Sequence, residues 1–178
     1  MKTIKFTILF LLFTTLSFSQ DFISLSAFHD VRFATVGDDK GNTPLTLNAG
    51  ARLSLEGYQV GQSYSSIIAE FEGADLEGGE YYRWSAGYAQ NFNEILENFT
   101  FSPSLQIAVI TRPDATITGM GNLDIAYNVT DHFSILLVNQ WIKRTDLETS
   151  PIRYSLFAGV KLNLFTQDVR TRQLAFCL

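Results

Sequence analysis

Few residues in this chain could support nucleophilic or metal chemistry. The sequence contains two histidines, His29 and His132, and one cysteine, Cys177. Zinc sites in proteins use three or four ligands drawn mainly from histidine and cysteine. Two histidines cannot make a multi-histidine site and one cysteine cannot make a thiolate site, so we expect no metal and no cofactor.

The spacing offers one catalytic arrangement, in which His132 lies two residues before Ser134. Side chains two apart on a strand share a face, so His132 could act as a base for Ser134. Asp131 or Glu148 would then orient the histidine. However, residues 129–132 (VTDH) have the composition of a tight turn, where a polar histidine is common. We therefore predict that the chain is not an enzyme, and a lipid-modifying hydrolase remains a minor alternative.

The elements that would position any such site follow an export signal. Residues 1–20 combine two lysines, an apolar run and small residues at positions 17 and 19, which predicts a secretory signal peptide over residues 1–19. The apolar run is shorter than the ~20 residues that a membrane-spanning helix needs. We expect one domain over residues 20–165, followed by a polar, disordered tail over residues 166–178.

The charge balance excludes one class of partner. The chain has 13 basic and 18 acidic residues, and Lys2 and Lys5 lie in the leader. An acidic protein repels nucleic acid, so no nucleic-acid role is indicated. Beyond the leader, the lysines are only Lys40, Lys143 and Lys161, which is few for a domain covered on all sides by water.

Alternating polar and apolar residues predict eight strands. The clearest is 45–57 (LTLNAGARLSLEG), in which leucine and alanine occupy one face. We expect the others at 22–36, 63–72, 81–92, 99–111, 117–128, 133–143 and 153–165. Most are longer than the 5 to 6 residues typical of globular strands and match the ~9–11 that a strand needs to cross a bilayer.

The predicted connections are short and turn-like, which favours an antiparallel up-and-down order of strands. The segment 73–80 (GADLEGGE) is one of them. If the N-terminus lies in the periplasm, four connections face outward and form an acidic rim, at which an extracellular partner could bind. The acidic residues of this rim are Asp38, Asp39, Asp75, Glu77, Glu80, Asp114, Asp146 and Glu148.

Seven charged residues fall on the polar faces of the predicted strands. In an eight-stranded barrel they would point into an interior just wide enough for side chains and would pair there, because an unpaired buried charge is costly. This predicts a filled interior and not a pore. The predicted interior charge network consists of Arg52, Glu56, Glu70, Arg83, Asp124, Arg153 and Lys161.

Aromatic residues cluster near the predicted strand ends, as in the girdles of membrane barrels, although strand propensity also enriches aromatics. The predicted girdle consists of Tyr58, Tyr64, Tyr82, Phe92, Tyr127, Trp141, Tyr154 and Phe165. Alternation alone is equally compatible with a soluble barrel or sandwich, because both have one apolar and one polar face.

The segments GADLEGGEYYRWSAGYAQNF and NVTDHFSILLVNQ and the closing strand YSLFAGVKLNLF resemble small outer-membrane β-barrels of the OmpA/OmpX-like superfamily, Bacteroidota type. The resemblance covers residues 21–165. It implies an eight-stranded antiparallel barrel with periplasmic termini, but no single activity. Members commonly end on an aromatic residue, whereas here residues 166–178 follow Phe165.

The leading hypothesis is therefore an all-β, eight-stranded transmembrane barrel with short loops, located in the outer membrane and surrounded by its lipid. We expect a monomer with a structural or surface-interaction role. The alternatives are a secreted soluble barrel or sandwich that binds a small apolar ligand, and the lipid-modifying hydrolase.

Overall fold

The computed structural model describes residues 22–37, 41–57, 63–77, 79–93, 95–112, 114–147 and 151–164. The predicted signal peptide, the predicted tail, Asp38, Asp39, Tyr58, Glu148 and Phe165 lie outside these ranges. The elements, in chain order, are β1 (Phe22–Asp30), α2 (Val31–Thr35), β2 (Asn48–Glu56), β3 (Ser63–Leu76), β4 (Gly79–Asn93), β5 (Phe99–Thr111), β6 (Ala115–Asn128), β7 (Phe133–Lys143) and β8 (Ile152–Asn163).

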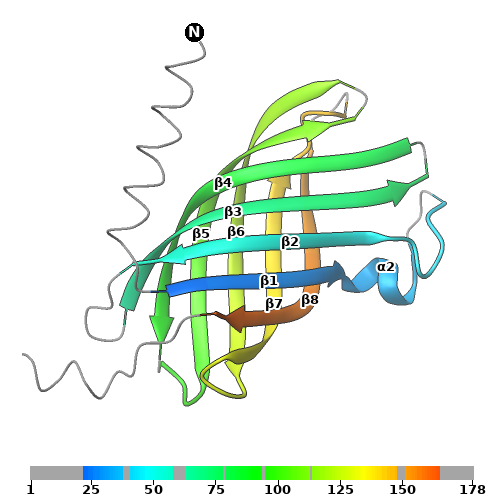
Figure 1. The fold of residues 1–178 in the computed structure, drawn as a ribbon. Helices are drawn as coiled ribbons and strands as arrows, with labels where there is room; N and C mark the ends of the chain where they lie inside the picture. Colours follow the sequence, from blue (N-terminus) through cyan, green and yellow to red (C-terminus); the bar gives the residue numbers. More distant parts are fainter. Residues whose placement is uncertain are drawn as a thin grey trace, which may run out of the picture.

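The eight strands form a closed antiparallel barrel in sequence order, which confirms the predicted fold class (Figure 1). Closure joins β1 to β8, where Ser24 pairs with Asn163 and Asp30 with Phe157. A closed barrel has no free edge strand, so every strand pairs with a neighbour on both sides. We call the end that carries α2 and the connections after β1, β3, β5 and β7 the α2 end of the barrel.

The expected first strand, 22–36, is wrong beyond Asp30. The chain turns there into α2 (Figure 1), because the Asp30 carboxylate accepts hydrogen bonds from the backbone N–H groups of Arg32 at 2.8 Å and Phe33 at 3.3 Å. Aspartate is one of the best residues at this capping position. The first connection therefore runs over residues 31–47 and is longer than predicted.

The expected connection 73–80 is also wrong. Strands β3 and β4 continue to pair through Gly73 opposite Tyr82, Ala74 opposite Tyr81 and Leu76 opposite Gly79. Glycine weakens a strand but does not prevent its backbone from pairing. The two strands therefore pair as far as Leu76 and Gly79, and Gly79 has a φ of +115°. The remaining strands differ from the predicted ranges by at most three residues at either end.

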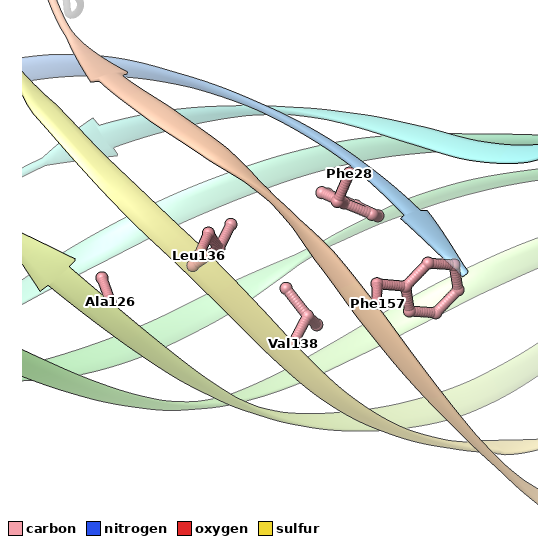
Figure 2. Packing of buried hydrophobic residues seen from close by; sticks show 5 residues of the cluster. All are labelled: Phe28, Ala126, Leu136, Val138 and Phe157. Carbon is pink, nitrogen blue, oxygen red and sulfur yellow. The ribbon is translucent and has the colours of Figure 1, made fainter. Parts of the chain in front are cut away.

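One apolar cluster fills the middle of the interior along β1, β6, β7 and β8. Figure 2 shows its members, Phe28, Ala126, Leu136, Val138 and Phe157. The rings of Phe28 and Phe157 meet edge to face with centroids 5.3 Å apart. A second cluster nearer the α2 end includes Tyr81, Ile110 and Met120. These clusters leave the rest of the interior to polar side chains.

Candidate functional site

The barrel is polar inside and apolar outside. Alternate residues of β2 illustrate this, since Arg52, Ser54 and Glu56 are buried while Leu53 is exposed. On β5, Ser104 and Gln106 face inward and Leu105 is 77% exposed. A water-soluble barrel would show the reverse arrangement, because burial of apolar surface is what stabilises a protein in water. The polar interior is therefore the candidate site.

Glu70 is the centre of the interior charges. One of its carboxylate oxygens accepts from Arg52 Nε at 2.7 Å, and the other accepts from Arg83 Nη2. Arg52 also donates to a carboxylate oxygen of Asp124. Arg83 Nη2 lies 2.9 Å from Glu72 Oε2. All five side chains are buried. Opposite charges in direct contact offset the cost of removing each of them from water.

A second pair lies nearer the end of the barrel opposite α2. Lys161 Nζ donates to Glu56 Oε1 at 2.6 Å, and Ser24 donates to the same oxygen at 2.8 Å. Tyr64 also interacts with Lys161 and Glu56. It shares the inward positions of β3 with Ser66, so its assignment to an outward girdle is wrong. Alternation places even-numbered residues of β3 inside, and the aromatic ring does not change that.

The structure thus joins six of the seven predicted network residues in ion pairs with one another or with Glu72. The seventh, Arg153, occupies an inward position of β8 but lies at the α2 end, apart from the other six, and makes no ion pair within the described residues. Sequence reasoning missed Glu72 because the strand was expected to end there. Its position two residues after Glu70, on the same face, was the available signal.

Several outward aromatic residues lie in two belts near the ends of the barrel, while Trp84 and Tyr88 lie at outward positions between them. Near the α2 end, Trp141 and Tyr154 contact each other with ring centroids 5.5 Å apart, and Tyr82 lies in the same belt on β4. Near the other end, Phe99 and Tyr127 are 5.2 Å apart. Of the predicted girdle, Tyr82, Phe92, Tyr127, Trp141 and Tyr154 have exposed side chains at outward positions.

The spacing of the belts can be derived from strand geometry. Tyr82 and Phe92 are ten residues apart on β4, which corresponds to ~33 Å along a strand and ~25 Å along the axis of a barrel whose strands tilt by ~40°. Outer-membrane barrels have an apolar band of ~25 Å between their aromatic girdles. The two belts therefore lie at a separation that matches a bilayer.

The possible catalytic residues do not come together. Ser134 is buried and donates to Asn128 Oδ1 at 2.8 Å. His132 lies in the exposed turn after β6, where its Nδ1 is 3.2 Å from the carbonyl oxygen of Asn163. Each side chain is therefore engaged with a different partner. A base must lie within hydrogen-bonding reach of its nucleophile, and this pair does not meet that requirement here.

The described residues contain no group of three or more histidine, cysteine, aspartate or glutamate side chains placed to hold a metal ion. In the same part of the chain, no helix is long and apolar enough to cross a membrane.

Together, these features define the class of the protein as an eight-stranded, antiparallel, up-and-down β-barrel with a side-chain-filled polar interior and an apolar outer surface. A solved structure with a similar fold, the outer membrane protein Ail of Yersinia pestis in a phospholipid bilayer nanodisc, superposes with a TM-score of 0.54. The two chains are 11% identical, and the match covers 82% of this chain and all of Ail. A structural similarity at 11% sequence identity establishes the fold alone.

No family model matches the chain, and no curated protein matches it.

Proposed function

We propose that this protein is a small outer-membrane β-barrel with a plugged interior that serves a structural or surface-interaction role. The observation that supports this most strongly is the composition of the outer face. Between the two aromatic belts, the outward positions of the described strands hold no Asp, Glu, Lys or Arg. The outward charges Asp75, Glu80 and Lys143 all lie at the α2 end. Charged groups on a lipid-facing surface are costly near the bilayer midplane.

Several polar groups on the outer face have partners there, which also suits a lipid environment. Asn139 donates to the Leu123 carbonyl oxygen at 3.2 Å and accepts from the Tyr154 hydroxyl at 2.8 Å. Gln90 accepts from the Tyr88 hydroxyl at 2.8 Å. A polar group in hydrocarbon has no water with which to bond, so such pairing lowers the cost of exposing it to lipid.

The interior favours a structural or interaction role over transport. The ion pairs and apolar clusters cross the barrel, and eight strands enclose only enough space for side chains. The same charges do not suit a secreted barrel that encloses an apolar ligand. The proposal includes no catalytic activity and no nucleic-acid partner.

The proposal extends to the family type of the protein, its processing and its orientation in the outer membrane. We infer a monomer of the OmpA/OmpX-like, Bacteroidota type, made with a signal peptide over residues 1–19, a barrel over 20–165 and a tail over 166–178. Periplasmic termini would direct the α2 end away from the cell. An extracellular partner would then meet the acidic side chains there, which include Asp75, Glu77, Glu80 and Asp114.

The test is the gel mobility of the membrane-extracted protein in SDS before and after boiling, combined with fractionation of the cells. A closed strand network resists SDS until it is heated, so we expect a shift in mobility on boiling and recovery in the outer-membrane fraction. Recovery in the soluble fraction with no shift would overturn the proposal.

A further inference from the structure

A cavity of about 570 Å³ lies at the α2 end of the barrel. Its lining comes from α2, from the start of β2 and from the adjoining ends of β3, β4, β7 and β8. Phe33, Leu76, Tyr81 and Ile142 supply apolar and aromatic surface. Cavities of this volume, with apolar walls and a few polar groups, are typical of sites for small molecules.

Four of the 13 basic residues of this acidic chain line the cavity: Arg32, Arg112, Arg144 and Arg153. Arg144 is neutralised by Asp146, with Nε 2.7 Å from Oδ1. Arg112 donates to the backbone oxygen of Glu77 at 2.9 Å and has no carboxylate partner within the described residues. Arg153 makes neither a hydrogen bond nor an ion pair in that part of the chain. Among the described residues, its guanidinium therefore has no carboxylate partner that would compete with a ligand.

The deeper lining contains two buried polar atoms that have no partner among the described residues: Asn48 Oδ1 and Gln140 Nε2. We call these the floor atoms. Their residues are at most 5% exposed. Arg83 Nη1 donates to Gln140 Oε1 at 2.6 Å, which leaves Nε2 as the free donor of that amide. Buried polar groups are nearly always bonded, so a donor and an acceptor left over beside one cavity point to a polar ligand.

We propose that this cavity binds a small hydroxylated organic anion of the sugar-acid class, with its carboxylate on Arg153 and its hydroxyl groups on the floor atoms. A guanidinium matches a carboxylate through two parallel hydrogen bonds. Hydroxyl groups both donate and accept, as the mixed floor atoms require. This small-molecule site goes beyond a surface-interaction role, because it requires no contact with another macromolecule.

The charges around the cavity favour a carboxylate over a more highly charged group. Glu77 and Glu80 also line the cavity, and the whole chain has a net charge of −5. A dianionic phosphate would be repelled more strongly by these groups than a monoanion. The aromatic side chain of Tyr81 provides a flat surface for the apolar face of a sugar ring.

The experiment compares galacturonate with galactose, which has the same ring but lacks the carboxylate. Each sugar is titrated by calorimetry into the full-length protein, folded in detergent micelles and checked by its shift on boiling. We expect galacturonate to bind about tenfold more tightly than galactose, as a charge-assisted pair requires. Arg153→Gln should abolish this difference, and Asn48→Ala should weaken the binding of both sugars.

Lys143→Gln is the matched control, because it removes one positive charge at the same end of the barrel from a side chain outside the cavity. Its galacturonate affinity should stay within about twofold of wild type, since exposed charges are screened by salt. If Arg153→Gln does not fold, Arg112→Gln takes its place and should weaken the binding of galacturonate alone. The proposal is overturned if folded wild type binds galacturonate no better than galactose, or if Lys143→Gln and Arg153→Gln lose affinity equally.

Discussion

At the scale of single residues, Glu70 determines how the interior charges pair, because its two oxygens bind different guanidinium groups, those of Arg52 and Arg83. Glu70→Ala would leave both arginines buried without this partner. We expect a loss of about 3–5 kcal/mol in the free energy of unfolding, as for other buried pairs that lose one member. Urea unfolding of the barrel in lipid vesicles measures this.

Glu80→Ala is the control for that change. Glu80 is exposed and, among the described residues, accepts only from the Tyr82 hydroxyl, so its loss should alter stability by no more than about 0.5 kcal/mol. Equal effects of the two substitutions would contradict the role given to Glu70.

A second residue-scale prediction concerns pH and Asp146, which lies in the connection after β7. Burial alone would raise the pKa of this carboxyl group, but the hydrogen bond and charge of Arg144 outweigh burial and lower the pKa below its ordinary value of 3.8. The pair therefore stabilises the connection above about pH 4. This stabilisation is lost as the pH falls through the lowered pKa.

Carbon-detected NMR titration of the Asp146 carboxyl group checks the pKa directly, and its midpoint should lie below 3.8. Amide exchange of residues 144–147 should accelerate only below that midpoint. In Arg144→Gln, the midpoint should return toward or above the ordinary value. A midpoint that does not change in this variant would argue against the pair.

At the scale of strands, Phe28 fits inside the barrel because both of its cross-strand partners, Gly50 on β2 and Gly159 on β8, lack side chains. A Cβ atom at Gly50 would lie 2.2 Å from the Phe28 ring, which is far inside contact distance. Gly50→Val should therefore cost about 1–3 kcal/mol through overpacking. Urea unfolding in vesicles provides the measurement.

Gly119→Val on β6 is the matched control, since nothing lies within 4 Å of a Cβ atom built there. Its stability should equal or slightly exceed that of wild type, because valine favours strands. Replacing Phe28 with Leu in the Gly50→Val variant should recover part of the loss. Failure of this rescue would mean that the clash with Phe28 is not the cause.

At the scale of the whole molecule, the outward apolar surface distinguishes a membrane barrel from a soluble one. Leu105 is 77% exposed at the middle of β5, whereas Leu96 is 56% exposed in the turn before that strand. If lipid surrounds the strands, Leu105→Arg should cost about 2–4 kcal/mol. Leu96→Arg should change stability by no more than about 0.5 kcal/mol.

Folding into vesicles, followed by urea titration, measures both variants. Their outer-membrane levels in cells should fall in the same order. If arginine is tolerated equally well at the two positions, water and not lipid surrounds Leu105, and the soluble alternative replaces the membrane barrel.

Much of this architecture could be predicted from the sequence, because the alternation of side chains along a strand is a local property. The range 99–111 agrees with β5 and the range 133–143 with β7. The charged residues of the polar faces, such as Arg52 and Arg83, were also found from alternation alone. Errors arose where one side chain redirected the backbone, as Asp30 does at α2, or where glycines suggested a turn in a segment that continues to pair, as at Gly73.

Other features were decided only by the tertiary structure. Closure of β1 on β8 brings the two ends of the chain together and selects which face of every strand is enclosed, and no local pattern contains that information. The pairing of Glu70 with two arginines and the separation of Arg153 from the network depend on the stagger between strands. The sequence by itself determined the strands and their two faces, because these follow from a period of two. The barrel's closure decided which charges meet, because their contacts join residues far apart in the chain.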